Sequence, residues 1–428
     1  MSLDVLLGLQ WGDEGKGKIV DVMAPRYGMV ARFQGGPNAG HTLEFDGIKH
    51  VLHQIPSGIF RQDIKNVIGN GVVLDPVIFR REVEALNKLK VEPQHNLYIS
   101  NKAQLILPTH AILDACYEES KGNNKIGSTL KGIGPTYQDK IARLGVRVGD
   151  IQSGDFKQTY QALTDKHCAI LDYYRFSYDL EEMEKLFFEA VEYLKTFHIV
   201  DTAYLVNQTL SQGIPVLAEG AQGSMLDVDF GSYPFVTSSN TMVAGVCSGL
   251  GVAPSRINQV YGIFKAYCTR VGSGPFPTEL DDPVGEKLRK IGHEFGATTG
   301  RARRCGWLDL PALKYAIMIN GVSRLFMMKA DVLNDFNEIK VCTQYRLPDG
   351  RRVEELPYDM NQPRLEPVYY TLPGWKQPLS GIEDFARMPD ELLSYVDFLE
   401  EALGVPIGIV SVGPDRTQTI LKAEMPAL

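Results

Sequence analysis

The residues best suited to chemistry gather near the start of the chain, in residues 12–18 (GDEGKGK). This segment follows the apolar run 5–7, which predicts a buried strand, and precedes residues that can open a helix. A strand, a glycine loop and a helix N-terminus together aim backbone N–H groups at phosphate. The spacing fits G-x-x-x-x-G-K, but Ile19 replaces the Ser or Thr that normally holds Mg²⁺. We therefore expect an anion site in which Asp13 holds the metal; a plain glycine turn is the alternative.

A second glycine loop, residues 34–42 (QGGPNAGHT), interleaves polar groups with small residues and so permits close approach of a ligand to the backbone. His41 is the histidine set within it, although His50 and His53 lie nearby and are alternatives. Imidazole and carboxylate are common proton-transfer groups, so Asp13 and His41 are a candidate base and acid pair.

Further loops carry cations and hydroxyl groups. Residues 296–304 (GATTGRARR) place three arginines within four positions, which suits bidentate binding of carboxylate or phosphate, although a solvated basic loop is the alternative. Two more loops combine glycine with polar residues: 127–135, which precedes Arg143 and Arg147, and 219–223, which is followed by the hydroxyl-rich segment 233–241. On an acidic chain, such loops favour a small anionic ligand.

The triplet 329–331 (KAD) follows the apolar run 325–328 and is typical of a base-reading pair in GTP-binding proteins. The stem of Lys329 can cover a guanine ring, while the carboxylate of Asp331 can accept hydrogen bonds from N1–H and the 2-amino group. On its own the triplet is a weak signal.

The elements that must position these loops alternate along the chain. Apolar runs at 67–68, 216–217 and 407–412 predict buried strands that end in glycine-rich loops. Amphipathic helices are expected after Asp75-Pro76, along the stripe Met183, Phe187, Ala190, Leu194 and Phe197, and from Pro389-Asp390 to a stop at Gly404. This alternation predicts an α/β fold with a mostly parallel sheet, whose ligands gather at the carboxyl ends of its strands.

Composition narrows the class of protein. The chain has 428 residues, 44 basic and 52 acidic, with a net charge of −8, which argues against a general nucleic-acid or membrane-surface binder. We expect no secretory signal and no membrane span, because no apolar run approaches the roughly 18 residues required. Six scattered cysteines lack a C-x-x-C pair and predict reduced thiols in the cytoplasm, with Cys305 buried and inert rather than reactive. Without repeats or polar linkers, residues 1–428 are expected to form one domain.

Taken together, the motifs resemble the adenylosuccinate synthetase family. The resemblance runs through QWGDEGKGK, QGGPNAGHT, IPSGI, GNGVVLDP, GIGPTYQDK, EGAQG, YPFVTSSNT, TRVGSGPFPTEL, FGATTGRARR, KADVL and SVGPDRT, in one order along nearly the whole chain. It implies GTP-dependent ligation of L-aspartate to IMP with Mg²⁺, giving adenylosuccinate, GDP and phosphate. It also implies a single large α/β domain related to P-loop GTPases, with inserted loops and helices, in a homodimer.

The resemblance further implies a mechanism. Asp13 removes the N1 proton of IMP, the 6-oxygen attacks the γ-phosphorus of GTP, and His41 assists the departing GDP oxygen. The amine of aspartate then displaces phosphate from C6 of the 6-phosphoryl intermediate. Lys16 neutralises the developing charge, and Arg143 reaches the partner's site.

Site residues follow from the same resemblance, residue by residue. The catalytic set is Asp13, His41, Lys16 and Gln222. The GTP set is Gly12, Glu14, Gly15, Lys16, Gly17, Lys18, Gly40, His41, Thr42, Arg303, Lys329, Ala330, Asp331, Ser411, Val412 and Gly413. The IMP set is Asp13, Lys16, Asn38, Ala39, Gly40, His41, Thr129, Arg143, Gln222, Thr237, Val271 and Arg301. The aspartate set is Ala297, Thr298, Thr299, Gly300, Arg301 and Arg303. The metal ligands are Asp13 and the carbonyl of Gly40.

Three departures from the family pattern stand out: Leu130-Lys131 in place of Gly-Arg, Ala302 within an arginine run, and Ala330 in place of Leu. Lys131 keeps a charge but loses the planar fork, which affects expected contacts to the 5′-phosphate. Two other classes of protein are the alternatives. A GTP-binding switch protein would not need the arginine-threonine loop or His41. A nicotinamide-dependent dehydrogenase lacks its G-x-G-x-x-G after the first strand.

Overall fold

The computed structural model describes residues 2–296, 300–361 and 365–422. Ten of the strands described there form a central sheet in the order β20-β19-β15-β11-β1-β10-β2-β5-β7-β9. Their bounds are β1 Leu3–Gly8, β2 Met29–Arg32, β5 Lys65–Ile68, β7 Leu97–Ser100, β9 His198–Val200, β10 Val216–Glu219, β11 Ile257–Lys265, β15 Arg324–Met328, β19 Ile407–Ser411 and β20 Thr419–Leu421. Every neighbouring pair is parallel except β19 with β20, which confirms the mostly parallel α/β sheet.

The sheet is buried on both faces. All six residues of β1 are buried, as are all four of β10, as expected for parallel strands covered by helices on each side. Leu3, Val5 and Leu7 join the large core on one face, whereas Leu6 packs with Ile19 of α1 (Lys16–Met23) on the other. The first strand therefore fixes the phosphate-loop helix against the sheet.

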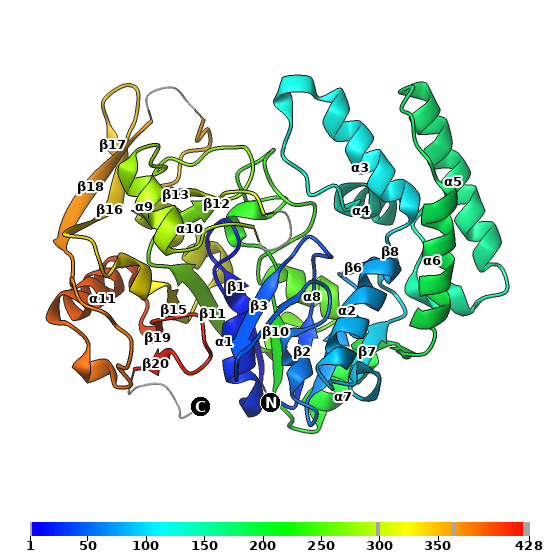
Figure 1. Ribbon diagram of the computed structural model, residues 1–428, viewed down its shortest axis with the longest axis horizontal. Coiled ribbons are helices and arrows are strands. Elements are labelled where there is room, and N and C mark those ends of the chain that lie inside the picture. The colour runs from blue at the N-terminus through cyan, green and yellow to red at the C-terminus, as the bar shows by residue number, and fades with distance from the viewer. Residues whose placement is uncertain (1, 297–299, 362–364, 423–428) are drawn as a thin grey trace.

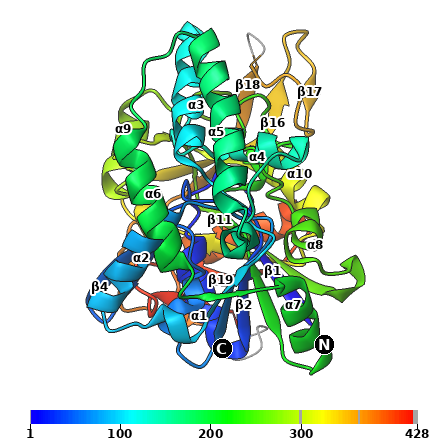
Figure 2. The same cartoon turned by 90° about the vertical axis from the view of Figure 1, so that its right-hand side faces the viewer.

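Two groups of elements flank the sheet in Figure 1. On the right stand helices α3 (Pro108–Ser120), α4 (Ile133–Ala142), α5 (Phe156–Tyr173) and α6 (Glu181–Leu194), which Figure 2 shows face-on. On the left lie α11 (Asp390–Leu403) and a smaller sheet of β14 (Leu308–Asp309), β16 (Glu338–Arg346), β17 (Arg352–Val353) and β18 (Glu366–Pro373). The remaining helices are α2 Pro76–Lys88, α7 Thr202–Ser211, α8 Ala244–Leu250, α9 Pro283–Ile291 and α10 Leu310–Asn320.

Short strands complete the fold. The hairpin of β3 (His41–Phe45) and β4 (Ile48–Leu52) follows the second glycine loop. Strand β12 (Cys268–Arg270) pairs with β13 (Arg304–Gly306), which begins where the arginine loop ends, and β6 (Val73–Leu74) pairs with β8 (Gln104–Leu105). Within the described ranges, no helix has both the length and the hydropathy that a bilayer crossing requires.

Two predicted helices are confirmed in detail. The Asp75 side chain caps α2 by accepting from the backbone N–H groups of Val77 and Ile78 at 2.8 and 3.0 Å. Helix α11 ends at Gly404, whose φ of 66° is left-handed and favours glycine. The prediction of an apolar stripe along α6 was wrong at Met183. This side chain is exposed, because the buried face of the helix begins one turn later at Phe187.

Candidate active site

One large cavity of about 1090 Å³ opens at the carboxyl ends of five adjacent strands, β19, β15, β11, β1 and β10. The loops after these strands line it together with the second glycine loop and residues 126–138. The predicted site residues on its wall are Gly12, Asp13, Glu14, Gly15, Lys16, Gly17, Lys18, Asn38, Ala39, Gly40, His41, Thr42, Thr129, Gln222, Thr237, Val271, Arg301, Arg303, Lys329, Asp331, Ser411 and Gly413. Residues distant in the sequence are therefore brought to a single site.

A few predicted residues lie elsewhere. Ala330 and Val412 do not line the cavity and their side chains belong to the core, so their contact with GTP stays a prediction that depends on their backbone atoms. Gly300 is exposed beside the cavity, and Arg143 lies on the surface at the end of α4. Ala297, Thr298 and Thr299 fall outside the described residues.

The phosphate loop leads directly into α1. Gly15, in the left-handed region with φ of 94°, precedes Lys16, the first helical residue. Gly17 must lack a side chain, because a Cβ there would lie 2.8 Å from the Cβ of His41. Glu14 is fully buried, and its carboxylate accepts from the backbone N–H of Gly12 at 2.9 Å and lies 2.5 Å from Lys16 Nζ. Glu14 thus stabilises the conformation of the loop through these contacts.

Lys18 points away from the phosphate loop. Its ammonium donates to Ser411 Oγ and the Gly413 carbonyl, both at 2.7 Å, and to the Gln418 carbonyl at 2.9 Å. Burial lowers the pKa of Lys18 to about 7. The side chain of Lys18, a residue of the predicted GTP set, therefore ties α1 to the loop after β19. Lys16 also lines the cavity, and its ammonium donates to Glu14 Oε2.

His41 is oriented by a carboxylate. Its Nδ1 lies 2.5 Å from Glu219 Oε1, and Ser57 donates to the same carboxylate through its hydroxyl and its backbone N–H at 2.6 and 2.8 Å. Burial lowers the pKa of His41, although Glu219 opposes the shift. With Nδ1 occupied, buried Nε2 has no hydrogen-bond partner in the described part of the chain, so it is available to a ligand.

This arrangement selects His41 over the two alternatives. His53 Nδ1 lies 2.7 Å from the Ala39 carbonyl, and the ring of His50 packs edge-on against Phe60. Neither lines the cavity. Glu219 itself was missed as a functional residue; its signal was its place at the end of the apolar run 216–217, in the motif EGAQG.

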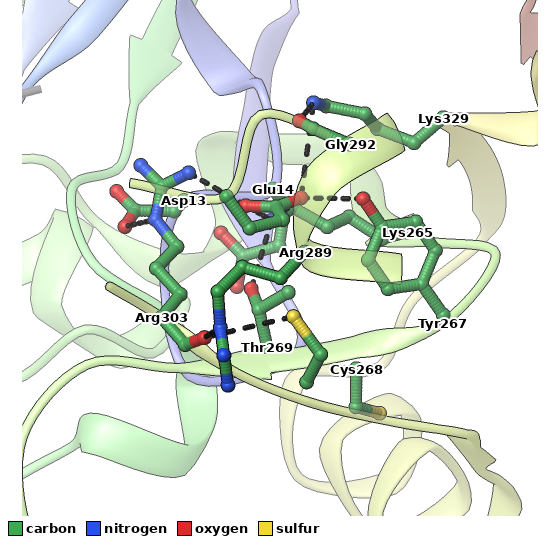
Figure 3. A network of polar contacts seen from close by, with 12 residues as sticks. Asp13, Glu14, Lys265, Tyr267, Cys268, Thr269, Arg289, Gly292, Arg303 and Lys329 are labelled. Carbon is green, nitrogen blue, oxygen red and sulfur yellow. Dashed lines mark hydrogen bonds and ion pairs between the residues drawn. The ribbon is translucent and has the colours of Figure 1, made fainter. Parts of the chain in front are cut away.

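Asp13 meets the arginine loop. Arg303 Nε donates to Asp13 Oδ2 at 2.7 Å, and Arg303 Nη1 donates to Glu294 Oε2 at 2.6 Å (Figure 3). Asp13 is 290 positions from Arg303 along the chain, whereas Glu294 is nine positions from it. Asp13 also adopts a left-handed backbone, with φ of 59°, which non-glycine residues seldom do and which is found preferentially at functional sites. A carboxylate and a guanidinium thus share the centre of the cavity wall.

The opposite end of the cavity has the features expected for guanine. Asp331 Oδ1 is buried without a hydrogen-bond partner among the residues described, and burial raises the pKa of this carboxyl group. A buried acceptor without donors is costly unless a ligand supplies them. Lys329 lies nearby and donates to the Gly292 carbonyl at 2.6 Å. Between the two ends, Gln222 Nε2 donates to Asn38 Oδ1 at 3.2 Å.

The residues present suit Mg²⁺. The Asp13 carboxylate and the Gly40 backbone both contribute to the same cavity wall, and hard oxygen donors are the ligands that Mg²⁺ prefers. Substrate phosphates and water usually complete such a site.

A second cluster resembles a metal site but is not one. Within the described ranges, His110, Asp139 and His167 are the one group of three whose ligand atoms lie within 4.8 Å of one another. His110 Nδ1 accepts the backbone N–H of Leu107 at 2.8 Å, so the neutral ring carries its proton on Nε2, which faces Asp139 Oδ2 at 2.9 Å. That nitrogen has no lone pair for a metal, and the cluster instead joins α3, α4 and α5.

The six cysteines are free, and Cys305 is buried as predicted. Burial raises the pKa of Cys305 to about 11, so the thiol stays protonated and unreactive at neutral pH.

Comparisons with known proteins identify similar proteins along nearly the whole chain. A family model for adenylosuccinate synthetase matches residues 5–420. An adenylosuccinate synthetase of Cytophaga hutchinsonii is 62% identical over 424 residues, covering 99% of this chain and 98% of that protein. One of Bacteroides thetaiotaomicron is 61% identical over 420 residues, covering 98% and 99%.

Two solved structures are also similar. A fully ligated adenylosuccinate synthetase of Plasmodium falciparum superposes with a TM-score of 0.93 at 40% identity, covering 99% of this chain and 100% of the other. The succinoaminodeoxyadenylate synthetase of cyanophage S-2L gives a TM-score of 0.63 at 20% identity, covering 98% and 95%, and shares the fold.

Proposed function

This chain belongs to the adenylosuccinate synthetase family, and from that membership we propose that its cavity ligates L-aspartate to IMP with GTP. The observation that carries the proposal is the cavity itself. One wall combines a phosphate loop, an imidazole with a free nitrogen and, at the far end, an unpaired buried carboxylate suited to guanine. A switch protein or a dehydrogenase would not require these three together with the arginine loop.

In the proposed first step, Asp13 accepts the proton from N1 of IMP. The 6-oxygen then forms a bond to the γ-phosphorus of GTP while the bond from that phosphorus to the GDP oxygen breaks. His41, held through Nδ1 by Glu219, presents Nε2 to the departing oxygen. Lys16 and the N-terminus of α1 stabilise the charge that develops.

In the second step, the amine of aspartate attacks C6 of the 6-phosphoryl intermediate. The C6–oxygen bond breaks, phosphate leaves, and the amine loses its proton. Arg303 suits the carboxylate of aspartate, since its guanidinium already pairs with one carboxylate at this position. Asn38, Gln222, Thr129 and Thr237 surround the space left for IMP.

Mg²⁺ would be held by Asp13 and the carbonyl of Gly40 and would neutralise phosphate charge. We further propose that residues 1–428 act as one domain, in the cytoplasm, where free thiols such as the six here persist.

We also propose a homodimer in which Arg143 completes the partner's IMP site. Arg143 caps α4 with a left-handed φ of 63° and does not line the cavity of its own chain. Apolar Ile141 and Leu144 beside it are 79% and 39% exposed. Exposed apolar side chains around a basic residue suit a protein interface.

The test is a four-component reaction. IMP, GTP, Mg²⁺ and aspartate are incubated with the protein, and the ultraviolet spectrum is followed for conversion of the purine. Product formation that requires all four components supports the proposal. Turnover of GTP without IMP and aspartate would instead indicate a switch protein.

A further inference from the structure

A buried carboxylate behind the cavity wall connects both of its ends. Glu294 is fully buried and contacts three cations: Lys265 Nζ at 2.9 and 3.0 Å, Arg303 Nη1 at 2.6 Å, and Lys329 Nζ at 3.7 Å. The hydroxyl of Tyr267 also donates to it (Figure 3). Through these partners Glu294 reaches Asp13 on one side and the guanine end on the other.

The charges explain why the cluster is stable when buried. Burial alone would raise the pKa of Glu294, but Lys265, Lys329 and Arg303 hold it well below its usual range. Lys265 is itself 1% exposed, so each of these two groups compensates the other. Buried ion pairs of this kind are sensitive to loss of one partner, because the other charge is left unpaired.

Both backbone polar groups of Glu294 are also hydrogen-bonded. Its N–H bonds to the Arg289 carbonyl and its carbonyl accepts the N–H of Arg303, both at 2.9 Å. Two residues earlier, the carbonyl of Gly292 accepts from Lys329 Nζ. Glu294 therefore lies where the arginine loop follows α9. Its carboxylate contacts Lys329, proposed to cover guanine, through Oε1, and Arg303, proposed to bind aspartate, through Oε2.

We propose that Glu294 is a positioning residue that holds Arg303 and Lys329 in place together, and so couples recognition of GTP to binding of aspartate. This inference rests on the proposed function of the cavity. Glu294 itself has no access to substrate, and it acts through the two cations that do.

The test compares Glu294→Gln with Glu279→Gln. Glu279 is a matched control because it pairs with Arg304, the residue next to Arg303, at 2.7 Å, but on the β12–β13 side. We expect Glu294→Gln to raise KM for both GTP and aspartate about tenfold, the effect of losing a charge-assisted hydrogen bond, with a smaller change in kcat. Glu279→Gln should change both KM values less than threefold.

A double-mutant cycle separates positioning from a general structural defect. If Glu294 acts through Lys329, adding Glu294→Gln to Lys329→Met should raise KM for GTP little further. Glu294→Asp keeps the charge opposite Lys265, and it replaces the glutamine variant should that one fail to fold. It should raise the same two KM values by a smaller factor.

Three results would overturn the inference. The Glu294 and Glu279 variants could change the KM values equally, KM could rise for only one of the two substrates, or the effects of Glu294→Gln and Lys329→Met on KM for GTP could be additive. Calorimetric binding of GTP to the wild type and Glu294→Gln, each with and without aspartate, gives a readout of the coupling that is independent of turnover. A coupling defect seen there, with no adenylosuccinate formed by the wild type, would fault the proposed reaction and not the role of Glu294.

Discussion

At the scale of single residues, His41 and its neighbours determine how the site handles protons. Burial lowers the pKa of His41 in the free protein, and its buried Nε2 has no hydrogen-bond partner among the described residues. Phosphate charge would raise the pKa of the ring again, because an opposite charge favours the protonated form. GTP binding should therefore be accompanied by proton uptake.

This proton uptake is the first prediction. Affinity for GTP should decrease as pH rises between the pKa of His41 in the free protein and its higher value in the complex. Calorimetry in two buffers of different ionisation enthalpy measures the protons taken up. His41→Asn should reduce the uptake, whereas Lys18→Met controls for the other nearby cation whose pKa lies near neutrality, at about 7. Uptake unchanged in His41→Asn would contradict the assignment.

Asp331 gives the second prediction, on nucleotide choice. Its unpaired oxygen can accept from N1–H and the 2-amino group of guanine, neither of which adenine offers. Asp331→Asn presents an amide that can donate to the 2-oxo group of xanthine. Its use of GTP should fall at least about a hundredfold and its use of XTP should rise, since unpaired buried polar groups discriminate strongly. A folded variant that still prefers GTP in steady-state assays would remove Asp331 from the base site.

At the scale of elements, the His110–Asp139–His167 cluster shows how a polar core can hold helices in place. Asp139 accepts from His110 on α3 and His167 on α5 at 2.9 and 2.8 Å, and it lies four residues before Arg143 on α4. Burial opposes ionisation, but the two histidines hold the pKa of Asp139 well below its usual range. The carboxylate is thus kept charged throughout the neutral range.

The third prediction follows from this cluster. Asp139→Asn keeps the shape but replaces one acceptor oxygen with a donor, which faces histidine N–H groups. We expect the free energy of unfolding to fall by about 2–3 kcal/mol, measured by urea denaturation at pH 7. Gln138→Ala, at an exposed neighbouring position, is the control. A change below roughly 0.5 kcal/mol, as for an ordinary surface substitution, would show that the cluster is not a structural link.

The same scale shows what the sequence could and could not predict. Strand ends, the Asp75 cap and the Gly404 stop depend on local spacing and backbone chemistry, so they were predicted correctly. The loops that line the cavity were also identified. The direction of Lys18 and the roles of Glu219 and Glu294 were not, because each depends on partners that only the folded sheet brings near.

At the scale of the whole molecule, the cavity of one chain is lined by Asp13 but not by Arg143. In the proposed homodimer, the partner's Arg143 would complete the IMP site. Symmetric dimers exchange such residues reciprocally across a twofold axis. Loss of Asp13 should therefore disable the site in the same chain, whereas loss of Arg143 should disable the site in the partner.

Subunit mixing is the fourth prediction. Asp13→Asn should lower kcat at least about a hundredfold, as removal of a general base does, and Arg143→Leu should weaken IMP binding. A mixture of the two should recover about a quarter of wild-type activity, because half of the dimers then carry one intact site. Circular dichroism establishes that each variant is folded. Mixtures that exchange subunits and remain as inactive as either parent would exclude a shared site.

The central claim is that the 6-oxygen of IMP attacks the γ-phosphorus of GTP before aspartate displaces it. IMP labelled with ¹⁸O at the 6-position tests this most directly, with mass spectrometry of the released phosphate. The account predicts one ¹⁸O atom in each phosphate formed, at a one-to-one ratio with adenylosuccinate. Unlabelled phosphate, with the label released to water, would contradict it.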